Sequence, residues 1–573
     1  MSRKGCNNVP SINATFTDPD AVRLEQPDGT WILLGSENAG AEAVESLLAT
    51  RDGAAFCRSH RDALIMFIRH SETAAQRFDA WKGLLSTREL FFAVRPAGDV
   101  VVSDHFVNVL SALPPGARLP DERGIVGHFI HRKVYGSATY SAAVTRLSNA
   151  EHLSIDALTR ETASTLFDRV EVEPEPRSPE EYVSAIDTTF AQSMAYAKSG
   201  TPAALTFSGG VDSTLLMTYV RDTATPLTFV PDTPEFGSET EYSRDALRLL
   251  GIRAEEVATP EANFVAMLEA STDACGFPTS SDAIPYFTDL TLTQPYDTFI
   301  VGHGADSAFG MSLKLARFAS WFRGRGVRGA VAKTAPHVPG HLGYRMRQVA
   351  PMATGFAKDP LDPDGYAGNI RTFGDTSLFE KLVDPSLITA VKKDQLEYVL
   401  RRVDRTADPN SAFLSHIELA HWAMVFVNPL LLERLAAHSV GRRIIGPYSD
   451  AATILELARV PVDERYVRGL RAKWILKDLL KKRLPDYPSD QRKKATALPF
   501  ERFYRDGPLA GIWDQYEVPD IFTGKDRDAV VAEPSTSTWN AITYAVWKQR
   551  IADNPTLRPH PSKFDVSFKI GAV

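Results

Sequence analysis

A short glycine-containing loop carries the most informative chemistry of this chain. The apolar run 203–207 predicts a buried strand, and residues 214–217 continue as a helix. The loop between them consists of Ser208, Gly209, Gly210, Val211, Asp212 and Ser213. Glycines let the backbone approach an anion closely, and a helix N-terminus adds partial positive charge. The loop therefore predicts a phosphate site, with Asp212 as a candidate Mg²⁺ ligand. It is not a Walker loop, because no Gly-Lys-Ser/Thr follows.

A second glycine loop follows another predicted strand. Residues 297–301 are typical of a buried strand, and Gly302-His303-Gly304-Ala305-Asp306 comes next. Ligands of parallel α/β sheets gather at the C-terminal ends of strands, so the two loops can converge on one nucleotide. We expect Gly304 beside that nucleotide and Asp306 as the second carboxylate on Mg²⁺. Taken alone, the loop would be typical of a glycine turn with an exposed aspartate.

The elements that must position these loops divide the chain into regions. Short strand-like runs separated by turns predict a β-rich domain over residues 1–170; they lie at 30–34, 63–68, 89–94 and 100–102. An acidic, proline-rich stretch at 171–181 predicts a linker. Alternating helix and strand patterns over 182–520 predict an α/β domain with a helical C-terminal half. Residues 521–573 are expected to form a helical extension and tail.

The composition is that of an ordinary globular protein. The 573 residues are 44% hydrophobic and 24% charged, and 64 basic against 71 acidic residues give a net charge of −7. This balance argues against a nucleic-acid coat, and no run approaches the ~20 apolar residues of a membrane span. Cys6, Cys57 and Cys275 lack the spacing of a disulfide framework or a zinc site. We therefore expect a cytoplasmic protein without nucleic-acid or membrane partners.

The loop at 208–213 resembles the PP-loop of ATP pyrophosphatases, and the motifs together resemble the asparagine-synthetase superfamily. The PP-loop, the 302–306 loop and the segment 473–500 fall in the order of that family. The resemblance implies cleavage of ATP between its α and β phosphates, with Mg²⁺ as cofactor. Residues 83–153 contain runs similar to the glutaminase domain of the family, which implies an αββα fold of the N-terminal-nucleophile type.

The N-terminus departs from the family pattern. The family glutaminase uses a cysteine at the processed N-terminus, where the free α-amine serves as base. This chain has Ser2, and Cys6 would serve only after removal of five residues. We therefore expect an inactive glutaminase-like domain and an amine supplied by the substrate itself. This departure favours two branches with idle glutaminase domains, the lasso-peptide cyclases and the β-lactam synthetases.

His303 and Glu433 are candidates for the base that assists amine attack. At the position of His303, asparagine synthetases carry Glu and β-lactam synthetases a catalytic Tyr. A histidine with an ordinary pKa near ~6.5 can take a proton from an attacking ammonium, or it can simply bond the loop backbone. Glu433 could match the carboxylate that pairs with that Tyr, although a helix-surface salt bridge is the simpler interpretation. Residues 433–450 are more similar to lasso cyclases than to asparagine synthetases.

Two lysines of a basic C-terminal segment match family positions. Lys473 matches a lysine that contacts the pyrophosphate, and Lys494 matches one that stabilises the oxyanion of amide formation. Other basic residues of the segment, such as Lys481 and Lys482, are expected on a solvated helix face.

The resemblance implies a ligase that adenylates a carboxylate and closes a macrolactam with the substrate's own amine, as lasso-peptide cyclases do. The substrate would be a peptide or small molecule bearing both groups, and a leader peptidase is a candidate partner. Alternatives are a β-lactam-synthetase-like or other small-molecule amide ligase and an asparagine-synthetase-type amidotransferase. The basic stretch 311–350 would suit a tRNA-modifying PP-loop enzyme. Ser307 stands where the family usually has Glu, so a non-catalytic relative that serves as a scaffold is a further alternative.

Overall fold

A computed structural model describes most of the chain. The described residues are 11–35, 39–70, 75–95, 98–156, 158–195, 197, 201–233, 237–279, 281–309, 337–338, 379, 381–402, 428–465, 467–468, 471–489 and 498–570. Ser2, Cys6, Lys494 and nearly all of the basic stretch 311–350 lie outside these residues, so the predictions made for them are not addressed by the structure.

A five-stranded parallel sheet forms the centre of the region from residue 179 to residue 489, in the order β13-β12-β11-β14-β15. The chain enters at the central strand, moves to one edge and then returns to the other side of that strand. The order therefore reverses between β11 and β14, which is where open α/β sheets bind ligands. The strands are β11 (Ala203–Thr206), β12 (Ala224–Pro231), β13 (Glu255–Thr259), β14 (Thr298–Ile300) and β15 (Arg443–Ile445).

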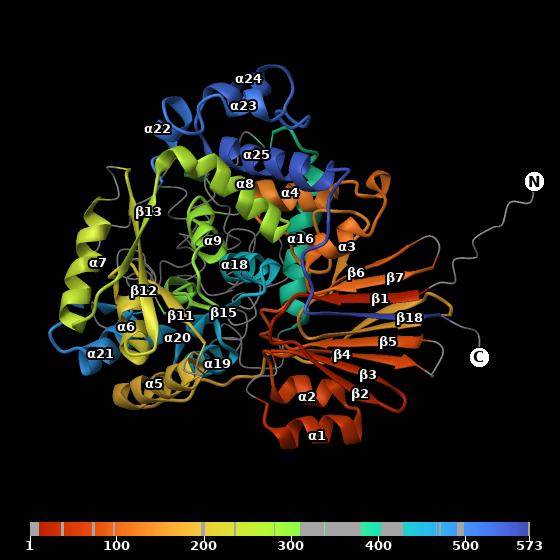
Figure 1. The fold of residues 1–573 in the computed structure, drawn as a ribbon, viewed down its shortest axis with the longest axis horizontal. Helices are drawn as coiled ribbons and strands as arrows, with labels where there is room; N and C mark the ends of the chain where they lie inside the picture. The colour runs from red at the N-terminus through yellow and green to blue at the C-terminus, as the bar shows by residue number, and fades with distance from the viewer. Residues whose placement is uncertain are drawn as a thin grey trace, which may run out of the picture.

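Helices cover both faces of this sheet (Figure 1). Side chains alternate along β11, so Ala203 and Leu205 enter one core while Ala204 enters the other. The first core includes α5 (Pro179–Ala195), α6 (Val211–Val220), α19 (Ala451–Arg459) and α21 (Trp474–Arg483). The second includes α9 (Ile284–Thr293) and α18 (Asn428–Ser439). Other helices among the described residues of this region are α7 (Gly237–Leu250), α8 (Phe264–Cys275), α10 (Ala305–Phe309), α16 (Pro385–Arg401) and α20 (Val462–Arg465). Before α21 lies a small hairpin of β16 (Val467–Arg468) and β17 (Arg471–Ala472).

Residues 11–170, called the N-terminal region below, form two sheets, one of which also includes the C-terminal strand β18. One has the order β18-β1-β7-β6-β8 and the other the order β10-β9-β5-β4-β3-β2. The first consists of β1 (Ser11–Phe16), β6 (Phe91–Val94), β7 (Val100–Ser103), β8 (Thr145–Arg146) and β18 (Phe564–Lys569). The second consists of β2 (Val22–Gln26), β3 (Gly29–Leu34), β4 (Leu64–His70), β5 (Ala75–Lys82), β9 (Glu151–Asp156) and β10 (Thr162–Leu166). The strands predicted at 30–34, 63–68, 89–94 and 100–102 are confirmed as β3, β4, β6 and β7.

The two sheets share one apolar core, to which β1, β4, β7 and β9 all contribute. Helices α1 (Ala41–Thr50) and α2 (Gly53–Ser59) cover the outer face of the six-stranded sheet. Helices α3 (Phe106–Ser111) and α4 (Glu122–His131) cover the outer face of the other sheet (Figure 1). The layers are thus helix, sheet, sheet, helix. That this region is a glutaminase-type domain stays a prediction.

The C-terminal part contains α22 (Phe500–Arg505), α23 (Ile512–Gln515), α24 (Gly524–Ala532) and α25 (Thr536–Trp547). The expectation of only helix and tail over 521–573 is wrong, because the segment ends in strand β18, which pairs antiparallel with β1. Phe564, Val566 and Phe568 alternate with exposed polar residues and pack into the core between the two sheets. None of the described helices combines the length and hydropathy that a bilayer crossing requires.

Candidate active site

The phosphate loop leaves the C-terminal end of β11 and enters α6, as predicted. Gly209 has φ +69°, and a Cβ there would lie 2.4 Å from the Tyr242 carbonyl oxygen. Only glycine fits this position without moving the backbone. Across the loop, the Ser208 amide donates to Ser213 Oγ at 3.2 Å, and the two hydroxyl oxygens lie 3.3 Å apart. The loop is therefore a tight turn with two hydroxyls at a helix N-terminus, which suits an anion.

The two predicted metal carboxylates meet at Lys473. Its Nζ lies 2.7 Å from Asp212 Oδ2 and 2.5 Å from Asp306 Oδ1. Burial lowers the pKa of Lys473, but the two carboxylates outweigh this effect and raise the pKa above its usual value. Lys473 has φ +53°, a left-handed conformation that is uncommon for a residue with a side chain. The first turns of α6 and α10, which follow β11 and β14, and the residue before α21 thus converge on one charged centre.

This centre fits Mg²⁺. Asp212 and Asp306 lie in the first turns of the helices that follow β11 and β14, and their carboxylates already bracket one cationic atom. Carboxylate oxygens are the ligands that Mg²⁺ prefers. No cluster of three or more His, Cys, Asp or Glu side chains suited to a metal occurs among the described residues. A Mg²⁺ ion here would therefore complete its shell with phosphate oxygens and water, as it does in nucleotide enzymes.

Two tyrosines to which the sequence assigned no role hold the phosphate loop. Tyr448 donates from its hydroxyl to the Asp212 carbonyl oxygen at 2.8 Å, and Tyr487 donates to the Gly209 carbonyl oxygen at 2.7 Å. Burial raises the pKa of Tyr448 well above its usual value and that of Tyr487 to about 12, so both remain donors at neutral pH. Tyr448 lies within the segment 433–450 that resembles the family, and this resemblance was the sequence signal that could have pointed to it.

The second loop leaves the C-terminal end of β14. Gly304 has φ +97°, and a Cβ there would lie 2.4 Å from Ser449 Oγ. Ser449 donates from its hydroxyl to the His303 carbonyl oxygen at 3.3 Å. The glycine therefore allows the loop after β14 to pass close to the loop after β15, and it directs His303 and Asp306 from the same strand end.

Among the described residues, the ring of His303 bonds a carboxylate and not the backbone. Its Nε2 lies 2.6 Å from Glu433 Oε1, and the ring of Phe287 packs edge-on at a centroid distance of 4.9 Å. Glu433 is fully buried on α18, so its interpretation as a helix-surface salt bridge is wrong. The sequence could not show this burial, because Glu433 occupies one turn of a helix that is covered on both sides.

The pair has the electrostatics of a base held by a carboxylate. Burial of His303 disfavours the imidazolium, but the charge of Glu433 and the hydrogen bond to it outweigh burial and raise the pKa of His303. Glu433 Oε2 is buried and accepts no hydrogen bond from the described residues. An imidazole with a raised pKa is a stronger proton acceptor, and the carboxylate fixes the orientation of its ring.

Of the predicted site residues, two groups are brought together by the structure. The phosphate loop, Lys473 and Asp306 form one group, and His303 with Glu433 forms the other. Gly304 joins them through the loop after β14. Lys481 and Lys482 are exposed on α21, as expected of a solvated helix face, and Lys494 lies outside the described residues.

A comparison with protein families gives a match over the central part of the chain. The family model described as asparagine synthase matches residues 185–516, which is more than half of the chain. The chain belongs to the asparagine synthase family. A search of curated proteins returned no match. As a family member, the chain is an ATP-dependent ligase that forms amide bonds, and the matched residues contain both groups of the candidate site.

Proposed function

We propose that this ligase adenylates a substrate carboxylate, releases pyrophosphate, and joins the acyl group to an amine of the same substrate. The observation that carries the proposal is the His303–Glu433 pair, which lies one loop away from the Lys473 centre. A ligase that uses free ammonia as nucleophile does not need a side chain that deprotonates the ammonium group of a larger substrate. A partly exposed imidazole held by a buried carboxylate suits the removal of a proton from a substrate ammonium.

The first step needs groups that stabilise charge on the departing pyrophosphate. The Ser208 and Ser213 hydroxyls and the amides of the loop would hold its oxygens, and Lys473 would add a point charge. Asp212 and Asp306 would hold Mg²⁺, which supplies charge neutralisation on phosphate oxygens when bound. Lys473 would exchange its carboxylate partners for phosphate as ATP and the metal enter.

The second step needs a base and a cation. His303 would accept the proton of the attacking amine, with Glu433 stabilising the imidazolium that results. Lys494, by its match to the family, would stabilise the tetrahedral oxyanion. The products are an amide, AMP and the released proton.

The substrate class that we favour is a peptide whose N-terminal amine attacks an Asp or Glu side chain, giving a macrolactam as in lasso-peptide cyclases. The similarity of residues 433–450 to those enzymes supports it. A leader peptidase and a precursor peptide are the partners that this class implies. A β-lactam-synthetase-like ligase is the second candidate, because His303 and Glu433 pair as the Tyr and Glu of those enzymes do.

Carboxylate-dependent ATP–pyrophosphate exchange tests the proposal. The panel contains linear peptides with a free N-terminus and one internal Asp or Glu, the same peptides with an acetylated N-terminus, and small β-amino acids. The proposal expects exchange with the peptides in both forms, but amide closure only with the free amine. Exchange with β-amino acids alone would favour the second candidate, and ADP as product would exclude both.

A further inference from the structure

Helix α18, which carries Glu433, lies between two cores. Leu430 and Ala437 lie on the same helix face as Glu433 and pack in the core beneath the parallel sheet. Leu431, Leu432, Leu435 and Ala436 face the opposite core, which includes α3 and α4 of the N-terminal region. The position of Glu433 therefore depends on what holds the far side of its helix.

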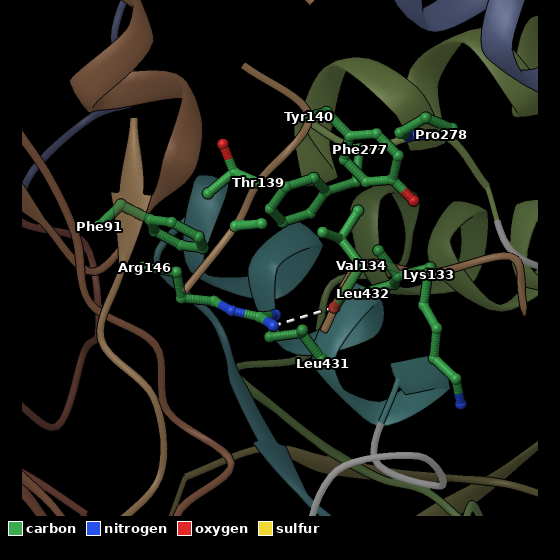
Figure 2. Close-up of a pocket in the computed structure, with 11 residues that line it drawn as sticks. Phe91, Lys133, Val134, Thr139, Tyr140, Arg146, Phe277, Pro278, Leu431 and Leu432 are labelled. Atoms are coloured by element: carbon green, nitrogen blue, oxygen red, sulfur yellow. Dashed lines mark hydrogen bonds between the residues drawn. The ribbon is translucent and has the colours of Figure 1, made fainter. Parts of the chain in front are cut away.

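Apolar packing on that far side is incomplete. Figure 2 shows a hollow between the N-terminal region and α18, with Leu431 and Leu432 on its wall. Phe277 and Pro278 line it from the segment after α8, and Arg146 at its edge donates to the Val134 carbonyl oxygen at 2.9 Å. None of the predicted site residues lines this hollow. Since missing contacts leave a helix less constrained, polar contacts carry more of the positioning here.

Two side chains bond the backbone of α18 on either side of Glu433. Cys275 donates from Sγ to the Leu432 carbonyl oxygen at 3.1 Å. His105 Nε2 lies 3.2 Å from the Leu435 carbonyl oxygen and 3.0 Å from that of Ala274. The first contact comes from α8, whereas the second comes from the N-terminal region.

His105 is suited to be a fixed donor. Its Nδ1 accepts from the Val107 amide at 3.3 Å, which caps α3 and leaves Nε2 to carry the proton. Burial lowers the pKa of His105 well below its usual value, and neighbouring His560 and His438 lower it further. The ring is therefore neutral, and its single Nε2–H is shared between α8 and α18.

We propose that His105 is a positioning residue for the His303–Glu433 pair, so that the N-terminal region acts on amide formation through α18. His105 touches neither His303 nor Glu433 in any described contact. It holds the helix backbone two residues after Glu433 and ties that backbone to the end of α8. This inference rests on the proposed function of the pair, and it gives the N-terminal region a role that needs no glutaminase chemistry.

The test uses the full-length protein labelled with ¹⁵N-histidine, and its readout is the ring nitrogen shifts of His303 at one pH. His303→Gln identifies the signal, and Glu433→Gln gives the shifts of the broken pair. His105→Asn keeps a cap for α3 but cannot reach Leu435, whereas His105→Gln restores a donor near the Nε2 position. His128→Asn is the matched control, because buried His128 bonds α25 through the Asn540 carbonyl oxygen at 3.1 Å and not α18.

We expect His105→Asn to move the His303 shifts toward those of Glu433→Gln, and His105→Gln and His128→Asn to leave them unchanged. With a carboxylate that supports exchange, amide formation in His105→Asn should fall by up to about 10²-fold while exchange is retained. Unchanged His303 shifts in His105→Asn would overturn the proposal. If His105→Asn does not fold, His105→Ser replaces it, because serine also caps α3 and leaves room for water. The same change in the His303 shifts is then expected, and unchanged shifts would again overturn the proposal. The His303 shifts are measured without substrate, so they test the positioning role alone. Failure of the proposed function would appear separately, as absence of carboxylate-dependent ATP–pyrophosphate exchange.

Discussion

The two groups of the candidate site differ most in the solvent access of one carboxylate in each, Asp306 and Glu433. At the phosphate side, Asp306 is 86% exposed, and Lys473 and Asp212 are partly exposed. At the amine side, Glu433 is 0% exposed and His303 is 22% exposed. A carboxylate near water interacts weakly and exchanges partners, whereas a fully buried carboxylate interacts strongly with its partner and keeps its geometry. The exposure of Asp306 thus suits the proposed exchange of Lys473 for a metal ion and ATP, whereas the burial of Glu433 suits a fixed position beside His303.

The largest effect is expected at the exchangeable carboxylates. Asp212→Asn or Asp306→Asn should lower AMP release by about 10³-fold, since metal stabilisation of phosphate charge is worth several kcal/mol. Asp187→Asn is a matched control, because Asp187 pairs with Arg483 on the outside of α21. Product analysis with a competent substrate measures the effect. A fully active double Asp212→Asn, Asp306→Asn variant would remove the metal role from both residues.

The two lysines should separate the steps. Lys494→Ala should still form the acyl-adenylate but lose amide formation by about 10²–10³-fold, because one charge–oxyanion contact is lost. Lys473→Ala should lower pyrophosphate formation itself, since its contact lies on the leaving group. Trapping of the adenylate with hydroxylamine distinguishes the two variants. A trappable adenylate in Lys473→Ala but none in Lys494→Ala would reverse the assignment.

Loss of the His303–Glu433 pair should slow amide formation but not adenylation. Glu433→Gln keeps the shape of the side chain but removes its charge, and we expect about 10²-fold slower amide formation, as for loss of a general base. ATP–pyrophosphate exchange should be retained, because the pair does not contact the Lys473 centre. Glu456→Gln, which removes a carboxylate paired with Arg459 on α19, serves as control. Equal losses in exchange and amide formation would contradict the separation of the two groups.

The pH profile gives the smallest and most specific effect. The pKa of His303 is raised by Glu433, and only the neutral ring can accept a proton. The rate of amide formation should therefore fall as pH drops through this raised pKa. In Glu433→Gln the pKa should decrease, so the acidic limb should move to lower pH even though the maximal rate is lower. An acidic limb at the same pH in both proteins would show that His303 is not the titrating base.

The two groups also differed in how far the sequence could predict them. The phosphate loop was predictable because a strand, two glycines and a helix start are contiguous, and local chemistry is visible in contiguous residues. The convergence of Asp212 and Asp306 followed from the rule that loops of a parallel sheet meet at one edge. The bond of Glu433 to His303 joins residues 130 positions apart and depends on the packing of α18 between two cores. No periodicity in the sequence reports such burial of a charged residue.

The pairing of the C-terminal strand β18 also depends on a contact that is distant in the sequence. Residues 564–569 alternate apolar and polar side chains, but a strand at the end of a helical segment finds its partner only in β1, more than five hundred residues away. The hydroxyl bonds of Tyr448 and Tyr487 to the phosphate loop likewise come from distant segments. Local pattern predicted the elements, whereas long-range pairing set the details of the site.

The central claim is that a substrate carboxylate becomes an acyl-adenylate before an amine displaces AMP. The most direct measurement uses the carboxylate selected by the exchange assay, labelled with ¹⁸O, and mass analysis of the nucleotide after amide formation. We expect one ¹⁸O atom in AMP and none in pyrophosphate, because AMP keeps the carboxylate oxygen that attacked the α-phosphorus. Transfer of ¹⁸O to inorganic phosphate together with ADP formation would contradict it.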